Sequence, residues 1–123
     1  MSDDTSPLAG FDGSARLFPL PNLVLFPHVM QPLHIFEPRY QHMTRDALDG
    51  DHLIALVLLQ SGWETNYDGA PPIHDVACLG KIVAENRLED GRFNILLRGV
   101  CRIRIDHEMP QAKLYRLAKV EPL

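Results

Sequence analysis

Five prolines within 27 residues constrain this chain more than any other feature. They interrupt the apolar run LFPLPNLVLFPHVMQPLHIFEPRYQHM, residues 17–43, at positions 19, 21, 27, 32 and 38. Proline fixes φ and lacks a backbone N–H, so this spacing excludes a long helix or a central strand. The run therefore predicts an extended ribbon that bends repeatedly and becomes helical only after Pro38. Such a ribbon can be buried but supplies little chemistry, which favours a binding scaffold over an enzyme.

Length and composition predict one domain and no membrane segment. A chain of 13.9 kDa should leave about 6,700 Å² of surface accessible once folded, roughly a third of the extended chain. The longest apolar run, residues 53–59, is too short to cross a bilayer. The start MSDDTSP is acidic, unlike a secretory signal, and Cys78 and Cys101 form no CxxC pair. These features predict reduced thiols and a cytoplasmic location.

Charge is distributed unevenly along the chain. Residues 1–80 hold three basic and ten acidic side chains, whereas residues 81–123 hold nine basic and six acidic ones. A surface that binds nucleic acid needs several converging phosphate contacts. In the second half acidic residues such as Glu85, Asp90 and Glu108 interrupt the basic ones, so the pattern disfavours nucleic acid as a partner.

Proline spacing and apolar periodicity predict the elements of the first half. Short strands are expected over residues 16–20 and 31–36. Pro38 begins a helix, since proline at the first helical position loses no hydrogen bond, and Gly50 ends it. The buried face of that helix is predicted from helical spacing to consist of Tyr40, Met43, Thr44, Ala47 and Leu48.

The run LIALVLL at residues 53–59 is apolar at both odd and even positions. Glycines at positions 50 and 62 flank it, which favours a strand covered on both faces over a short buried helix. Residues 61–76 then form a long loop, and compact domains rarely keep such a loop without a use.

A hairpin is the clearest local feature. Residues 79–88 and 93–106 flank Asp90–Gly91, a pair typical of tight hairpin turns. In the second arm most apolar residues share one parity and the arginines lie mostly on the other, so one face should be buried. Gly99 falls on the apolar side, where a missing side chain permits a bend or a close crossing. A last strand is expected over residues 114–120.

These elements number about six strands and one helix, with no internal repeat. Long strands and a glycine bend favour a closed or half-closed barrel, which also removes unpaired strand edges. The sequence therefore predicts a mainly β pseudo-barrel with one α-helix after the second strand.

Three blocks of sequence resemble one known family. They are LFPLPNLVLFPHVMQPLHIFEPRY, the apolar strand that follows, and LGKIVAENRLEDGRFNILLRGVCRIRI. Their order and spacing over residues 16–121 are similar to those of the amino-terminal substrate-binding domain of the Lon proteases. The form LHIFEPRY most resembles the stand-alone bacterial versions of that domain, which lack the protease, and the related region of cereblon.

The resemblance implies a PUA-like pseudo-barrel of mixed strands that recognises unfolded or tagged polypeptides and sometimes self-associates. The chain stops at Leu123, before the helical portion that family members normally append, and it lacks the ATPase and peptidase domains. We therefore expect a flexible acidic tail over residues 1–14 and a single domain over residues 15–123, truncated before that portion. Most of the positions that match the family pattern look architectural, so none is carried over as a binding site. The matching positions are Pro19, Phe26–Pro27, Pro32–Leu33, Phe36–Glu37, Arg39–Tyr40, Gly80, Asp90–Gly91 and Arg98–Gly99.

The sequence offers no catalytic or metal-binding motif. Asp75 stands where a phosphate-binding loop that ends in Gly80–Lys81 would need its first glycine. Ser61 is the only serine beyond position 14, so a serine–lysine dyad of the Lon type has no place. Both cysteines are expected to be buried and inert, because Cys101 lies on the apolar parity of its strand. The six histidines show no close ligand pair, so neither a metal nor a cofactor is predicted.

Four side chains are candidates for binding a polypeptide: Leu25, Phe26, Trp63 and Tyr67. Trp63 and Tyr67 are large amphipathic side chains in a polar loop, as interface anchors often are, although a lid folded onto the barrel would also explain them. Leu25 and Phe26 are either core or an exposed patch, and core is favoured.

Glu37 and Arg39 could receive the end of a polypeptide. The favoured interpretation is structural: Glu37 caps the helix start, and Arg39 pairs with a nearby carboxylate.

Together these features predict a non-enzymatic protein-recognition module. An extended client would pack apolar side chains against loop 61–76 and the proline-rich run, with backbone pairing to an open strand. One alternative is a homo-oligomeric scaffold joined by apolar patches, and another is that the chain is a fragment of a complete ATP-dependent protease. A third is an RNA-binding module, with phosphates contacted by Arg98, Arg102, Arg104 and Arg116.

Overall fold

The computed structural model describes residues 8, 10–67, 69–110 and 113–123. It confirms a mainly β chain with one helix after the second strand. In chain order the elements are β1 (Ser14–Leu20), β2 (Met30–Ile35), α1 (Pro38–Asp49), β3 (Leu53–Leu58), the short 3-10 helix η2 (Trp63–Asn66), β4 (Val76–Arg87), β5 (Phe93–Glu108) and β6 (Leu117–Pro122).

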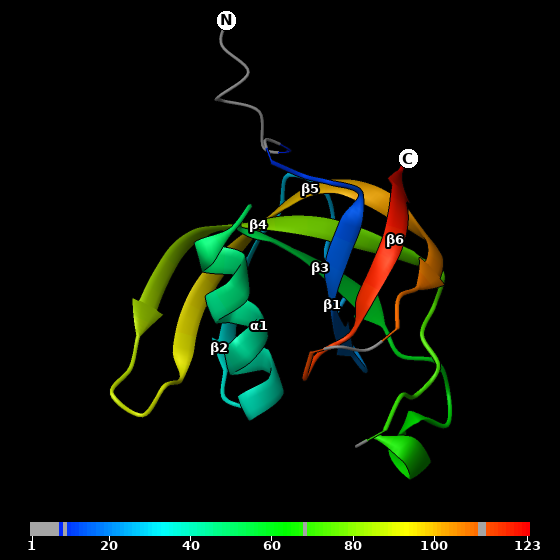
Figure 1. The fold of residues 1–123 in the computed structure, drawn as a ribbon, viewed down its shortest axis with the longest axis horizontal. Coiled ribbons are helices and arrows are strands. Elements are labelled where there is room, and N and C mark those ends of the chain that lie inside the picture. The colour runs from blue at the N-terminus through cyan, green and yellow to red at the C-terminus, as the bar shows by residue number, and fades with distance from the viewer. Residues whose placement is uncertain (1–7, 9, 68, 111–112) are drawn as a thin grey trace, which may run out of the picture.

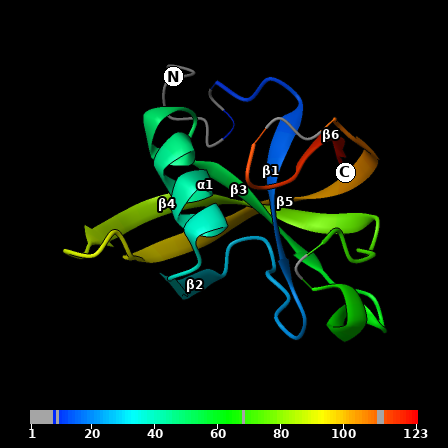
Figure 2. The same ribbon diagram turned by 60° about the horizontal axis from the view of Figure 1, so that its bottom comes forward.

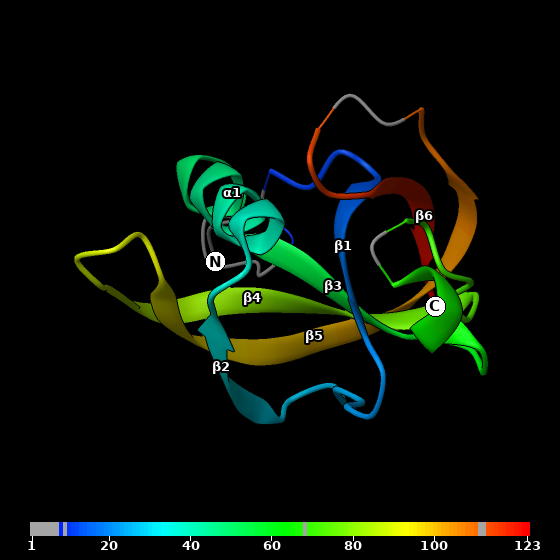
Figure 3. The same ribbon diagram turned by 90° about the horizontal axis from the view of Figure 1, so that it is seen from below.

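Five of the strands close into a ring. β5, β4, β3, β1 and β6 lie side by side in that order, and β6 pairs back with β5 (Figure 1). β1 and β3 run parallel while the other neighbours run antiparallel, so the sheet is mixed. β2 pairs with the first half of β5, beyond the ring (Figure 3). This arrangement confirms the predicted pseudo-barrel.

β3 is buried on both faces, as its sequence predicts. Leu53, Ala55 and Val57 belong to a cluster to which all five ring strands contribute, which we call the barrel core. Ile54 and Leu56 belong to a second cluster, the helix core, which includes side chains of α1. Alternate residues of one strand therefore hold the two cores together.

The helix α1 covers the helix core. It contacts β1, β2 and β3, and Figure 2 shows it lying along one side of the ring. Pro38 stands in its first turn and Gly50 caps its end, both as predicted. Its buried residues are four of the five predicted ones, Tyr40, Met43, Thr44 and Ala47, and Leu48 is partly buried against them.

Gly99 is the point at which two backbones cross. The ribbon that joins β1 to β2 (residues 21–29) passes over β5 there. The His28 N–H donates to the Gly99 carbonyl at 2.8 Å, and the Gly99 N–H donates to the Val29 carbonyl at 2.9 Å. A Cβ at Gly99 would overlap the Phe26 carbonyl oxygen and lie 3.1 Å from the Cα of Pro27. The predicted close crossing is thus confirmed, and a register shift in the β4–β5 pairing lies beside it.

Strand bounds depart from the prediction near the C-terminus. β5 runs on to Glu108, and its last residues pair with β6 although they are polar and exposed. β6 begins only at Leu117, because Tyr115 turns its side chain into the helix core instead. Most of the predicted acidic tail lies outside the described residues; of the rest, Leu8 and Phe11 pack against the barrel core.

Candidate functional site

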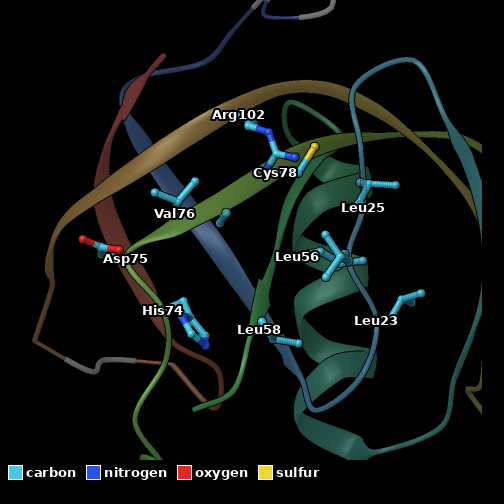
Figure 4. A pocket seen from close by; sticks show the side chains of 11 residues that line it. Leu23, Leu25, Leu56, Leu58, His74, Asp75, Val76, Cys78 and Arg102 are labelled. Atoms are coloured by element: carbon cyan, nitrogen blue, oxygen red, sulfur yellow. The ribbon is translucent and has the colours of Figure 1, made fainter.

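A groove of about 370 Å³ lies between the ribbon and the start of β4 (Figure 4). One side is formed by Leu23–Leu25 of the ribbon, and the other by residues 74–78, where loop 61–76 runs into β4. Leu56 and Leu58 of β3 and Arg102 of β5 complete the lining. The two segments that the sequence assigns to client binding therefore meet at one place.

The ribbon alternates between buried and exposed side chains. Leu25 is 2% exposed and belongs to the helix core, where a Cβ on Gly80 would lie 3.0 Å from its Cδ2 atom. Val24 and Phe26 are 46% and 51% exposed. The preference for a core position is confirmed for Leu25 and wrong for Phe26. Leu25 thus anchors the ribbon and lines the groove, while its neighbours face solvent.

Phe26 lies beside the groove, because its ring contacts Arg102, a residue that lines the groove. The guanidinium carbon of Arg102, a groove residue, lies 5.2 Å from the centre of the Phe26 ring. Sequence reasoning named Arg102 only as a phosphate contact in the RNA alternative. Its place in the groove depends on the ribbon crossing at Gly99, which brings residues about 75 positions apart together, and no local pattern reveals that.

Trp63 and Tyr67 do not line the groove, and Tyr67 contacts the start of α1. Their rings meet edge to face at 5.6 Å. The Tyr67 hydroxyl donates to Glu37 Oε1 at 2.5 Å, and the Arg39 guanidinium lies 5.0 Å from the centre of the Tyr67 ring. Burial and the hydrogen bond to Glu37 raise the pKa of Tyr67. This arrangement matches the lid interpretation of the loop aromatics.

Glu37 and Arg39 follow the structural interpretation in part. Glu37 occupies the N-cap position, and Arg39 Nε donates to its Oε2 atom at 3.3 Å. The Glu37 side chain makes no capping hydrogen bond. It accepts a hydrogen bond from the Tyr67 hydroxyl instead. Because Tyr67 is 30 residues away in sequence, the spacing around Pro38 could not reveal this partner. We call the Glu37–Tyr67 contact the latch.

Breaking the latch should loosen the loop without unfolding the domain. We expect Tyr67→Phe to raise amide hydrogen-exchange rates at residues 61–67 about fivefold, since one hydrogen bond to a carboxylate is lost at a partly exposed site. Tyr115→Phe is the matched control, because it removes a comparable 2.5 Å bond, to Asp46, and should leave the loop unchanged. Equal exchange in wild type and Tyr67→Phe would show that the latch does not hold the loop.

The arginines of the RNA alternative differ in their surroundings. Arg116 donates to both carboxylate oxygens of Glu108, at 2.7 and 2.6 Å, and to the Pro71 carbonyl at 2.9 Å. Arg98 lines a separate hollow with His28, while Arg102 lines the groove. A phosphate at Arg116 would have to displace the carboxylate already bound there.

The thiols are protonated at neutral pH. Burial raises the pKa of Cys78, which lines the groove, to about 11. Burial also raises the pKa of Cys101, although Cys101 is only half-buried where the sequence predicted a buried side chain. A cysteine nucleophile needs the thiolate form, so neither thiol is activated.

Within the described residues, no three His, Cys, Asp or Glu side chains gather closely enough to hold a metal ion. Within the same residues, no helix has the length and apolar character needed to cross a membrane.

This fold is similar to that of solved Lon amino-terminal domains. A Lon N-terminal domain protein from Xanthomonas campestris superimposes with a TM-score of 0.68 at 26% identity, over 89% of this chain and 60% of that one. The N-terminal domain of Mycobacterium avium complex Lon protease has the same fold, with a TM-score of 0.67 at 12% identity, over 89% of this chain and 54% of that one.

The family model for the ATP-dependent protease La (LON) substrate-binding domain matches residues 14–123, and the chain belongs to that family. A Lon protease of Xanthomonas oryzae pv. oryzae is 30% identical over 95 residues, which are 77% of this chain and 11% of that protein. Lon protease 2 of Syntrophobacter fumaroxidans is 28% identical over 112 residues, or 91% of this chain and 14% of that protein. The chain thus spans about a tenth to a seventh of these relatives.

Proposed function

We propose that this chain recognises polypeptides without modifying them, and that the groove binds a short extended segment of an unfolded client. The observation that carries the proposal is the meeting of the ribbon and the end of loop 61–76 around one largely apolar groove. The family's description as a substrate-binding domain supports the same class of function.

Exposed apolar side chains around the groove support a binding role. Val24 and Val76 line it and are 46% and 39% exposed, and Phe26 stands beside it. Apolar side chains gathered at a hollow commonly mark a binding surface. Affinity should be low, with Kd on the order of 0.1–1 mM, because a shallow groove must offset the entropy lost when an unfolded client becomes ordered.

Hydrogen exchange in the presence of a permanently unfolded protein tests this proposal. With reduced, carboxymethylated lysozyme near 1 mM, we expect amides at 23–30 and 74–78 to exchange about twofold to tenfold more slowly, since the slowing follows one plus the ratio of client concentration to Kd. Native lysozyme should have no effect. Val24→Ser should weaken binding about fivefold, because it removes apolar surface that the client would cover.

Val83→Ser is the matched control. Val83 is 41% exposed and lies on β4 outside the groove, so its substitution should leave affinity unchanged. Slower exchange confined to residues 61–67 would place binding at Trp63 and Tyr67 instead of the groove. Unchanged exchange throughout the described residues would refute the proposal.

Three further expectations belong to the same proposal. Residues 15–123 act as one domain, and the two free cysteines fit a reducing compartment such as the cytoplasm.

Self-association ranks second to client binding. In the described part of the chain β2 pairs only with β5, and Pro32 within it lacks an N–H donor, which disfavours pairing along its outer edge.

A further inference from the structure

Arg102 differs from the other half-buried arginines of this structure. Four of them pair with a carboxylate: Arg16 with Asp51 at 2.7 Å, Arg39 with Glu37 at 3.3 Å, Arg92 with Asp90 at 2.6 Å and Arg116 with Glu108 at 2.6 Å. Arg102 is also half-buried, yet within the described residues no carboxylate lies within ion-pairing distance of it. Its recorded contact is with the face of the Phe26 ring, at 5.2 Å.

The unpaired charge of Arg102 lies at one end of the groove. Arg102 lines the groove and pairs across the sheet with Cys78. Figure 4 shows the guanidinium close to Cys78 at one end of the groove, with His74 toward the other end and the Asp75 carboxylate directed away from Arg102. Between them the floor is apolar, with Leu25, Leu56 and Leu58. The groove thus has an apolar floor and one cationic side chain, Arg102, at one end.

The Arg102 guanidinium is preorganised to bind a carboxylate. An aromatic face beneath it limits the orientations of its plane without using its N–H donors. Partial burial weakens competition from water, so a carboxylate that approaches it would form charge-assisted hydrogen bonds. A neutral side chain in the same place would leave the half-buried charge without a partner.

We propose that the groove selects extended segments in which a large apolar side chain is followed two residues later by Asp or Glu, whose carboxylate binds Arg102. This inference rests on the proposed function and adds a rule for choosing clients. We commit to a side-chain carboxylate inside the client rather than to a chain end, because a groove open to solvent admits an internal segment. An extended residue advances about 3.3 Å and alternate side chains point the same way, so an apolar side chain and a carboxylate two residues further on can reach the apolar floor and Arg102 together.

Three eight-residue peptides test the rule against 15N-labelled protein at pH 7 and low salt. All have a blocked N-terminus and one phenylalanine in glycine–serine surroundings. In the first, with a blocked C-terminus, Asp stands two residues after the phenylalanine; in the second, Asn replaces that Asp. In the third the chain ends at the phenylalanine with a free carboxylate. We expect the Asp peptide to bind about fivefold more tightly than the Asn peptide, and the preference to shrink at high salt.

Variants assign the preference to Arg102. Arg102→Gln should remove the difference between the Asp and Asn peptides. Arg102→Lys, which keeps the charge but not the planar fork, should retain about a twofold preference. Arg104→Gln is the matched control: Arg104 lies two residues along the same strand, outside the groove, and its loss should leave the fivefold preference intact.

The possible results distinguish the preference for an acidic client residue from the binding of clients in the groove. Equal affinity for the Asp and Asn peptides, with amide shifts at residues 23–25 and 74–78, would overturn the rule and leave groove binding standing. Tightest binding of the third peptide would also overturn it, in favour of a receptor for chain ends. If no peptide shifts the groove amides even at several millimolar, groove binding itself is refuted.

Discussion

Gly99→Ala should lower the free energy of unfolding by about 3 kcal/mol, at the upper end of the usual range for overpacked sites. The added Cβ would overlap the Phe26 carbonyl oxygen, which is backbone and cannot rotate away. The ribbon would have to lift from β5, so the two hydrogen bonds between Gly99 and residues 28–29 would lengthen or break. Urea denaturation followed by far-UV circular dichroism measures the loss.

Gly62→Ala separates this clash from the general effect of losing a glycine. Gly62 has φ +90°, but a Cβ there would meet no atom within 4 Å. Only the backbone conformation is then penalised, by about 1 kcal/mol. If the two alanine variants were equally destabilised, the contact with Phe26 would contribute nothing, and the ribbon would not depend on the crossing.

Leu25→Ala is expected to lower the free energy of unfolding by about 3 kcal/mol, within the usual range for a buried leucine. Leu25 is 2% exposed and packs within the helix core over Gly80, so truncation leaves a cavity beneath the ribbon. The same substitution should weaken client binding, because the floor of the groove is lost. Chemical denaturation gives the first effect, and peptide titration at a temperature where the variant remains folded gives the second.

Phe26→Ala, one residue further on, is the control. Phe26 is 51% exposed, so its truncation should change the free energy of unfolding by no more than about 0.5 kcal/mol. A comparable loss of stability in both variants would contradict the alternation of buried and exposed side chains along the ribbon.

The sequence predicted those parts of the fold that rest on local physics. Helix α1 follows from Pro38, Gly50 and a face with helical spacing, and the β4–β5 hairpin follows from Asp90–Gly91. The end of β5 was missed because His107 and Glu108 are polar and are ordered by pairing with β6 rather than by burial. The sequence of neither strand contains a pattern that predicts this pairing between β5 and β6.

The candidate site was predicted less completely than the fold. Proline spacing identified the ribbon, and loop length identified residues 61–76, but the four candidate residues fall in two places. Only Leu25 lines the groove; Phe26 stands beside it. Tyr67 contacts the start of α1, and Trp63 packs against Tyr67. Whether any of them binds a client stays a prediction. Arg102 was overlooked because its importance arises from a missing partner, which only a folded arrangement can reveal.

The double burial of β3 has a consequence for how its register is encoded. In most sheets a slip by one residue is resisted because polar side chains would turn inward, but β3 has no polar side chain to turn. The barrel core instead contains four alanines, Ala15, Ala55, Ala77 and Ala118, beside larger side chains that include Leu53 and Val57 of β3, whereas Ile54 and Leu56 face the helix core. Side-chain volume, rather than polarity, therefore tells this strand which way to face.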